Sequence, residues 1–216
     1  MNLKSDKLEI LNKYAELLNE CKTARLTGTR GVDEIFKLQI LDCVPSVEFL
    51  PVKPQSKIID VGSGGGLPGI VWSIMRPDLK IILLDSIQKK CTAMQNIVNA
   101  LNLNNVEIIC GRVEELKDLR AKFDLASARA VGNLKLTLKL LTPLVKSGGR
   151  ILTFKGAKLN DELNECNIKD WRKLNLTEPQ IKYYENDNAE QDKNINSSRC
   201  VIFWDKIILK IKKPSR

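Results

Sequence analysis

Histidine is absent from the 216 residues of the chain. Its absence excludes every mechanism in which an imidazole acts as general base, and every metal site that needs imidazole ligands. Cysteine occurs six times, but no C-x-x-C pair is formed, so the spacing does not support a four-cysteine zinc site and is typical of free thiols. We therefore expect no bound metal.

Long apolar runs are also missing from the sequence. No stretch approaches the roughly 18 apolar residues that a membrane-spanning helix needs. The first residues lack the basic segment and apolar core of a secretory signal, and Asp6 argues against a transit peptide. We expect a cytoplasmic, monomeric protein that does not bind a membrane.

Positive charge, in contrast, is in excess. The chain has 35 lysines and arginines against 26 aspartates and glutamates, which gives a formal net charge of +9. A summed positive potential attracts polyanions and raises their encounter rate, so nucleic acid is the partner class that this charge favours. Without a motif, solvated lysine faces would explain the same charge equally well.

Residues 1–54 are expected to form a helical cap. Apolar residues recur at helical spacing over Ser5–Glu20 and again from Ile35 to Val44, after which three prolines follow within ten residues. Arg25 and Arg30 lie in the loop between these helices, where a phosphate contact and two solvated side chains are equally good interpretations. The remaining residues, 55–216, form the second and larger unit.

Strands and helices alternate in this larger unit. Apolar segments typical of parallel strands lie at residues 58–61, 80–84, 106–110, 123–127 and 150–154. Helices are expected at residues 66–75, after Ser86 as N-cap, shortly after Glu115, from Asn133 to Leu144, and over 161–174.

The last two predicted strands, residues 180–184 and 199–206, are separated by a polar loop too short for an ordinary crossover helix, which indicates a hairpin. The sequence therefore predicts a Rossmann-like α/β fold. Its mostly parallel seven-stranded sheet has helices on both faces and a C-terminal antiparallel hairpin.

The first strand ends in four glycines within five residues, in the segment K-I-I-D-V-G-S-G-G-G-L-P-G (57–69). Gly64 to Gly69 satisfies G-x-G-x-x-G, the dinucleotide fingerprint, which predicts an NAD(P)-binding oxidoreductase. Read as Asp60-x-Gly62-x-Gly64-x-Gly66, the same segment is the first motif of S-adenosylmethionine-dependent methyltransferases, where the turn wraps the methionine part. Asp85, at the end of the second strand, can accept both ribose hydroxyls in either case.

Two features favour S-adenosylmethionine as cofactor. The exit of the third strand, Arg112-Val113-Glu114, can meet an adenine edge in the methyltransferase arrangement. Little protein follows the fifth strand, whereas a dehydrogenase needs protein to place its substrate against the nicotinamide. Ligands of such sheets bind beyond the carboxyl ends of the strands, where Arg129 and Lys155 also lie.

Five segments resemble one family in order and spacing: DVGSGGGLPGI (60–70), LLDSIQKK (83–90), RVEE (112–115), SARA (127–130) and FKG (154–156). They are similar to the bacterial small-subunit ribosomal RNA guanine-N7 methyltransferases, long called glucose-inhibited division protein B, from about Tyr14 to Lys206. The resemblance implies a class I methyltransferase fold and ribosomal RNA, free or in the small ribosomal subunit, as substrate. It also implies a cofactor site lined by Gly62, Leu67, Val113, Glu114 and Arg129.

The cap departs from the family pattern. Arg25 stands where the family commonly has Asn, and Gln39 stands where it commonly has His. The segments that would bind the cofactor match throughout.

Methyl transfer to guanine N7 suits a chain without histidine. N7 carries an unprotonated lone pair, so an in-line displacement needs alignment and no general base. We expect Arg112, Arg129 and Lys155, with Lys89 or Lys90, to hold phosphates and the guanine edge. The alternatives are an NAD(P)-binding oxidoreductase and a module that binds cofactor or RNA without turnover.

Overall fold

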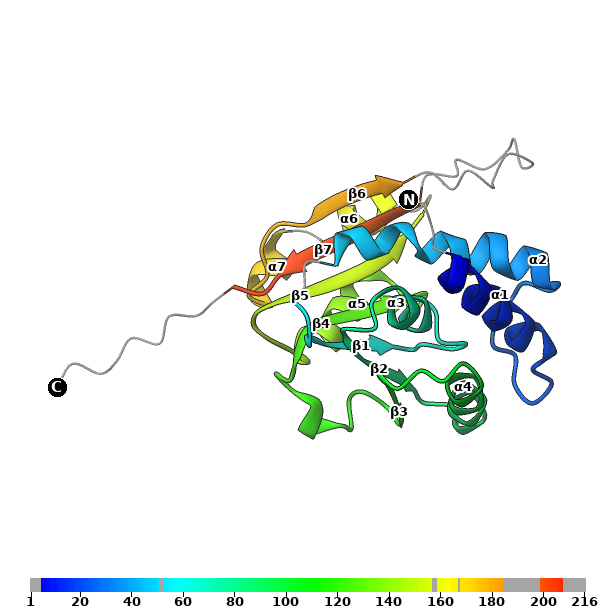
Figure 1. The fold of residues 1–216 in the computed structure, drawn as a ribbon. Coiled ribbons are helices and arrows are strands. Elements are labelled where there is room, and N and C mark those ends of the chain that lie inside the picture. The colour runs from blue at the N-terminus through cyan, green and yellow to red at the C-terminus, as the bar shows by residue number, and fades with distance from the viewer. Residues whose placement is uncertain (1–4, 51–52, 157–158, 167, 185–198, 208–216) are drawn as a thin grey trace.

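The computed structural model describes residues 5–50, 53–156, 159–166, 168–184 and 199–207 (Figure 1). Seven strands form one sheet in the order β3-β2-β1-β4-β5-β7-β6. The strands are β1 (Lys57–Val61), β2 (Lys80–Asp85), β3 (Val106–Cys110), β4 (Phe123–Arg129), β5 (Val145–Lys155), β6 (Gln180–Tyr184) and β7 (Arg199–Asp205). The first five are parallel, while β7 runs antiparallel to both β5 and β6. The predicted sheet and its closing hairpin are confirmed.

Helices cover both faces of the sheet. They are α1 (Ser5–Glu20), α2 (Val32–Ile35), α3 (Gly69–Met75), α4 (Gln88–Ala100), α5 (Leu134–Leu141), α6 (Leu159–Glu165) and α7 (Ile168–Lys173). One core cluster joins the N-terminal helices, α3 and α4 to one face, with Leu11, Ile70 and Met94 completely buried. The other cluster joins α5 and the start of α6 to the opposite face, with Leu138 and Trp204 completely buried.

Four predicted helices differ from the structure. α3 begins at Gly69 and not at residue 66, because Gly66 has a φ of 97°, which no α-helix contains. The second cap helix, α2, is only four residues long. The chain then continues in π and 3-10 turns, of which the last begins at Pro45 and ends at Phe49.

After Glu115 the chain makes only a 3-10 turn, Lys117–Leu119. The predicted helix over 161–174 is divided into α6 and α7.

The N-terminal segment shares its core with the sheet. Tyr14 and Ile35 are completely buried in the same cluster as Ile58 and Leu125 of the strands. The boundary between a cap (1–54) and a methyltransferase domain (55–216) stays a prediction. In the part of the chain that the structure describes, none of the helices has the length and apolar content of a membrane span.

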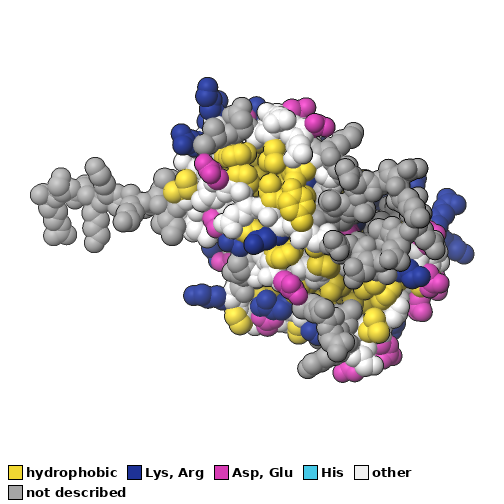
Figure 2. All heavy atoms as spheres, turned by 90° about the horizontal axis from the view of Figure 1, so that it is seen from above, with side chains coloured by type: hydrophobic (Ala, Val, Ile, Leu, Met, Phe, Trp, Pro, Cys, Tyr) yellow, Lys and Arg dark blue, Asp and Glu magenta, His cyan; other side chains and the backbone are white. Residues whose placement is uncertain are grey.

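The net positive charge is not gathered on the face above β6 and β7. In the part of that face drawn in colour, Figure 2 shows lysine and arginine side chains scattered both within the face and at its outline, with acidic and hydrophobic side chains between them. Tyr183 of β6, 62% exposed, is one of the large hydrophobic residues at the surface. A basic surface must therefore be sought elsewhere on the molecule.

Candidate active site

The predicted site residues follow the carboxyl ends of five neighbouring parallel strands. In sheet order these are Glu114 after β3, Asp85 of β2, the glycine loop 62–66 after β1, Arg129 of β4 and Lys155 of β5. The strand order reverses between β1 and β4, and such a switch point is where open α/β sheets bind ligands. The glycine loop lies at this point.

Positive φ angles and close packing explain the glycines of the loop. Gly62, Gly64 and Gly66 have φ angles of 69°, 60° and 97°, which L side chains rarely adopt. A Cβ on Gly62 would lie 2.5 Å from Cγ2 of Val131, and one on Gly65 would lie 2.9 Å from the carbonyl oxygen of Leu26. At Gly64 a Cβ would be in ordinary van der Waals contact with the carbonyl oxygen of Leu26 at 3.7 Å, so only the positive φ favours glycine there.

The N-terminal segment holds the loop from one side. The Tyr14 hydroxyl donates to the carbonyl oxygen of Gly65 at 2.8 Å, and Tyr14 is completely buried. Leu18 and Leu26 pack against the position where a Cβ of Gly65 would lie. Sequence periodicity placed Tyr14 only in an apolar stripe, and no local signal indicates its contact with the loop.

Asp60 precedes the glycine loop and connects the end of β1 to the start of α3, after the loop, and to β4. Its carboxylate accepts from the backbone N–H of Gly69 at 3.3 Å and from the Ser127 hydroxyl at 2.7 Å. The side chain is completely buried, and desolvation by this burial raises the pKa of Asp60 to about 6 in spite of those hydrogen bonds. Because no surface of Asp60 is exposed, it positions the loop in this structure and does not present its carboxylate to a ligand.

Asp85 links the loop to α4. One of its carboxylate oxygens accepts from the Gly64 N–H and the other from the Ile87 N–H, each at 2.9 Å. Asp85 thus takes the place predicted for Ser86 as the side chain at the start of α4, and no side chain caps that helix at its N-cap residue. Each carboxylate oxygen has a second lone pair that these bonds do not use.

The segment after β3 lies beside Asp85, because the Gly111 N–H donates to the carbonyl oxygen of Asp85 at 3.0 Å. Val113 is half-buried against the core, while Arg112 and Glu114 are exposed. Lys89 is exposed in the first turn of α4. Asp85, the glycine loop and the segment after β3 are therefore neighbours, as the sequence predicted.

A cavity of about 470 Å³ lies on the other side of the loop, at the carboxyl ends of β4 and β5. Arg129 and Lys155 both line it. Arg129 makes an ion pair with Asp42 at 3.2 Å and donates to Oε1 of Gln39 and Sγ of Cys43, each at 3.0 Å. Desolvation by burial raises the pKa of Cys43 to about 12, so Arg129 faces a neutral thiol there.

Lys155 is paired as well. Its ammonium donates to Glu162 of α6 at 2.6 Å and to the carbonyl oxygen of Gly132 at 3.3 Å. The same Glu162 oxygen accepts from the Leu134 N–H, at the start of α5, at 2.8 Å. Both carboxylates that line the cavity, those of Asp42 and Glu162, are therefore ion-paired, which suits alignment of a substrate better than removal of a proton.

The four cations predicted to hold substrate do not form one cluster. The structure brings Arg129 and Lys155 to one cavity, whereas Arg112 and Lys89 follow β3 and β2 on the far side of the glycine loop. Among the residues that the structure describes, no three His, Cys, Asp or Glu side chains are grouped so as to hold a metal ion.

Comparison with solved structures shows the fold. An S-adenosylmethionine-dependent methyltransferase from Aquifex aeolicus has a TM-score of 0.58 and 13% identity, over 91% of this chain and 98% of that one. A mutant of MtNAS in complex with S-adenosylmethionine has a TM-score of 0.61 and 13% identity, over 92% of this chain and 72% of that one. The Rossmann-like methyltransferase fold predicted from the sequence is confirmed.

Comparison of sequences shows the family. The family described as rRNA small subunit methyltransferase G matches residues 7–191. A ribosomal RNA small subunit methyltransferase G from Clostridium perfringens is 36% identical over 169 residues, which are 76% of this chain and 71% of the relative. Another, from Mycoplasma capricolum, is 38% identical over 172 residues, 78% of this chain and 74% of the relative. The chain belongs to the rRNA small subunit methyltransferase G family.

Proposed function

We propose that the protein transfers a methyl group from S-adenosylmethionine to N7 of a guanine in small-subunit (16S) ribosomal RNA. The observation that carries this proposal is the glycine loop at the switch point of the sheet, next to the carboxylate of Asp85 and in a chain of this family. The names of the relatives support the substrate.

The residues present fit the cofactor. Asp85 bonds the loop at Gly64, and the unused lone pairs of its carboxylate suit a ligand that carries ribose hydroxyls next to the loop. The methionine part would be held by the loop residues Gly62, Gly64, Gly66 and Leu67. Asp85 would bind the ribose, and Val113 and Glu114 would contact the adenine. Arg129 would contact the side of the cofactor that faces the substrate cavity. Asp60 would act indirectly, as the residue that positions the loop.

When bound, S-adenosylmethionine supplies a methyl group on a sulfonium. The task of the chain is then to align guanine N7 and to exclude water, which contributes several kcal/mol when reacting atoms are well placed. Lys155 can donate to guanine O6, beside N7, and Arg129, which lines the same cavity, can orient the base. Arg112 and Lys89, exposed at the strand exits, would hold RNA phosphates.

The two alternatives are less well supported. An NAD(P)-dependent oxidoreductase does not agree with the family of the chain. A module that binds cofactor or RNA without transferring a methyl group would have the same fold, and only an activity assay distinguishes it from an enzyme. Ribosomal RNA as substrate supports a cytoplasmic location. The monomeric state stays a prediction.

The test is transfer of labelled methyl from S-adenosylmethionine to naked 16S ribosomal RNA and to purified small subunits, followed by mapping of the labelled nucleotide. We expect label on one guanine, with strand cleavage chemistry specific for N7-methylguanine at that position. Label elsewhere contradicts the N7 assignment. Cofactor binding by calorimetry without any label favours the module, and binding of NAD in place of S-adenosylmethionine favours the oxidoreductase.

A further inference from the structure

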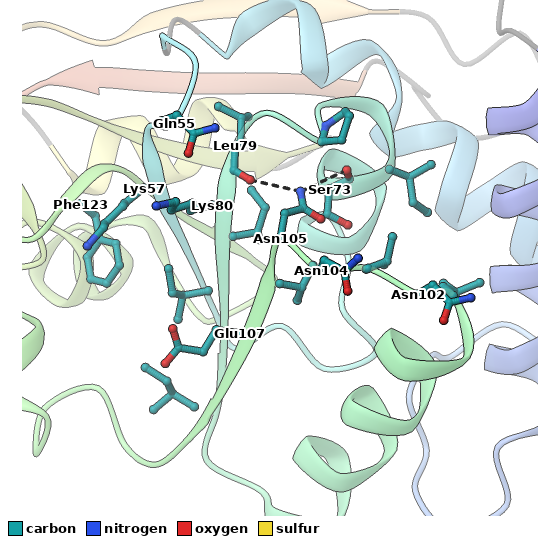
Figure 3. A pocket seen from close by; sticks show the side chains of 18 of the residues that line it. Gln55, Lys57, Ser73, Leu79, Lys80, Asn102, Asn104, Asn105, Glu107 and Phe123 are labelled. Atoms are coloured by element: carbon teal, nitrogen blue, oxygen red, sulfur yellow. Dashed lines mark hydrogen bonds between the residues drawn. The ribbon is translucent and has the colours of Figure 1, made fainter.

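A second, larger cavity of about 910 Å³ lies at the opposite end of the strands from the candidate active site, around the amino ends of β1, β2 and β3 (Figure 3). We call it the amino-end groove and define it by Lys57, Lys80, Asn104, Glu107 and Lys122, which line it from different segments. None of these residues belongs to the candidate active site. The proposed methyl transfer therefore leaves this groove unexplained.

Positive charge is concentrated on one wall of the groove. Lys57 and Lys80 are register partners at the amino ends of β1 and β2, so their side chains lie next to each other on the same face of the sheet. Figure 3 shows both side chains extending toward Phe123. Like charges placed directly opposite each other on neighbouring strands destabilise a sheet, so this arrangement is not explained by stability.

These lysines are also available to a ligand. Lys57, Lys80 and Lys122 are exposed, and within the described part of the chain no side-chain hydrogen bond or ion pair of theirs is formed. The nearby acid Asp124 pairs with the Lys146 ammonium at 2.9 Å and accepts from the backbone N–H of Lys57 at 2.8 Å, so it contacts the main chain of Lys57 and leaves the Lys57 ammonium without a hydrogen bond. Among the residues that line the groove, Glu107 is the one acidic side chain.

The floor of the groove is the part of the sheet face over β2 and β3, where no helix of the described residues packs, although α5 and α6 cover the same face farther along the sheet. None of the five residues of β3 is fully buried, although both faces of a parallel strand are normally covered. The connection from β3 to β4 supplies only the 3-10 turn Lys117–Leu119 where a crossover helix would pack. The side chains of Ile82, Ile109 and Phe123 consequently form an apolar floor beneath the lysines.

The groove continues around the end of β3 to a wall of amides. Asn105 is part of the scaffold, because its Nδ2 donates to the carbonyl oxygens of Ser73 at 3.3 Å and Leu79 at 3.1 Å (Figure 3). Asn102 and Asn104 beside it are exposed. Their amides are neutral donors of the kind that contact phosphate and ribose oxygens.

We propose that the amino-end groove is a second contact surface for the substrate RNA and binds its phosphodiester backbone. This inference rests on the proposed function, which supplies an RNA as substrate. Unpaired lysines that neutralise phosphates release condensed counterions, and that release gives affinity without dependence on base sequence. Because the groove lies at the amino ends of the strands, it binds an RNA segment other than the one held at the carboxyl ends.

The test compares two variants with the same loss of charge. The groove variant combines Lys57→Gln, Lys80→Gln and Lys122→Gln. The control variant combines three exposed lysines from α1, α5 and β6, as Lys13→Gln, Lys139→Gln and Lys182→Gln. Cooperative thermal unfolding of each variant and equal S-adenosylmethionine binding by calorimetry establish that both variants are folded.

Binding of fluorescently labelled 16S ribosomal RNA is measured by anisotropy over a range of salt concentrations, and binding to purified small subunits by sedimentation. We expect the groove variant to bind the RNA roughly tenfold more weakly than the control variant. The slope of log affinity against log salt should fall by roughly 2 to 3, because each lost phosphate contact removes about 0.7–0.9.

Equal RNA affinity and equal slope for the two variants would overturn the inference, as would absence of RNA binding by the wild-type protein at low salt. A groove-dependent affinity for subunits together with groove-independent affinity for naked RNA would also overturn it, in favour of an acidic protein partner. Methylation is measured separately. If wild type methylates N7 but the variants bind alike, only the groove fails; if RNA binding depends on the groove but no N7 is labelled, only the proposed function fails.

Discussion

The cavity at the carboxyl ends of the strands and the amino-end groove differ in whether their charged side chains are ion-paired. At the carboxyl ends the cations Arg129 and Lys155 are ion-paired with carboxylates, and Asp60 is buried beneath the glycine loop. At the amino ends Lys57 and Lys80 stand exposed next to each other. The first arrangement fixes geometry before a ligand arrives, whereas the second keeps its charges hydrated and free for a polyanion.

The difference indicates what each end can recognise. Paired and partly buried groups hold few conformations, so they lose little entropy on binding and favour one small ligand in one orientation. Exposed lysines have many conformations and a charge that salt screens, which suits an RNA backbone of variable shape. Removing charge should therefore affect stability in the cavity lined by Arg129 and Lys155, and RNA affinity in the amino-end groove.

The largest effect is expected from Arg129→Met. This change removes the cation opposite Asp42, whose side chain is 2% exposed, and breaking a buried pair from one side costs about 3–5 kcal/mol of unfolding free energy. Adding Asp42→Asn should restore part of the loss. Urea unfolding measures both.

The matched control is Lys146→Met, which breaks the ion pair with Asp124 on the surface. That pair has side chains 46% and 34% exposed, so its loss should cost less than about 1 kcal/mol. Equal costs for Arg129→Met and Lys146→Met would contradict the contrast between a buried, structured end and a solvated one.

The next effect is a pH dependence that Asp60→Asn should remove. Burial raises the pKa of Asp60 from 3.8 to about 6, so the folded state prefers the protonated carboxyl. The stability that this preference contributes is complete below about pH 4 and is lost as the pH rises through about 6. The amide of the variant does not titrate, so the difference in unfolding free energy, wild type minus variant, should fall by about 2 kcal/mol between pH 4 and pH 7. A difference that is constant over this range would show that Asp60 titrates normally.

The sequence was sufficient to predict the strands, their parallel direction and the hairpin, because apolar runs bounded by glycine, proline and polar residues are local signals. The row of strand exits that contains Asp85 and Arg129 followed from topology. The partners of these residues could not be predicted, because the pairing of Arg129 with Gln39 joins positions 90 residues apart. The contact of Ser127 with Asp60 depends in the same way on the register of β1 against β4.

The amino-end groove shows a different limit of sequence reasoning. Lys57 and Lys80 were not distinguished from other lysines, since only strand pairing makes them neighbours. The short connection after β3 was predicted to contain a helix, and the missing helix is what leaves the sheet face open. Both features are non-local, as are the contacts around Arg129.

A smaller effect, on cofactor binding, is expected from Gly62→Ala. The φ of 69° and the approach of a Cβ to Val131 make alanine strained at this position, at a cost of about 1–3 kcal/mol. We expect the free loop to relieve this strain by leaving the conformation that binds the cofactor, so that binding must restore it. Calorimetry should then show S-adenosylmethionine binding weakened about tenfold or more, since about 1.4 kcal/mol is a factor of ten. Gly28→Ala is the control, because a Cβ there meets nothing within 4 Å, and it should bind like wild type. Unchanged binding by the Gly62→Ala variant would remove the loop from the cofactor site.

The smallest effect has the opposite sign and is the sharpest test of the contrast. Lys80→Gln relieves repulsion between Lys80 and its register partner Lys57, so it should stabilise the folded protein by about 0.2–1 kcal/mol at low salt while weakening RNA binding. High salt screens this repulsion, so the gain in urea unfolding should disappear there. Lys139→Gln, at an exposed position of α5, should change neither property. A loss of stability in Lys80→Gln would mean that the lysine supports the fold, whereas a gain together with weaker RNA binding means that the chain tolerates a destabilising charge pair because RNA neutralises it.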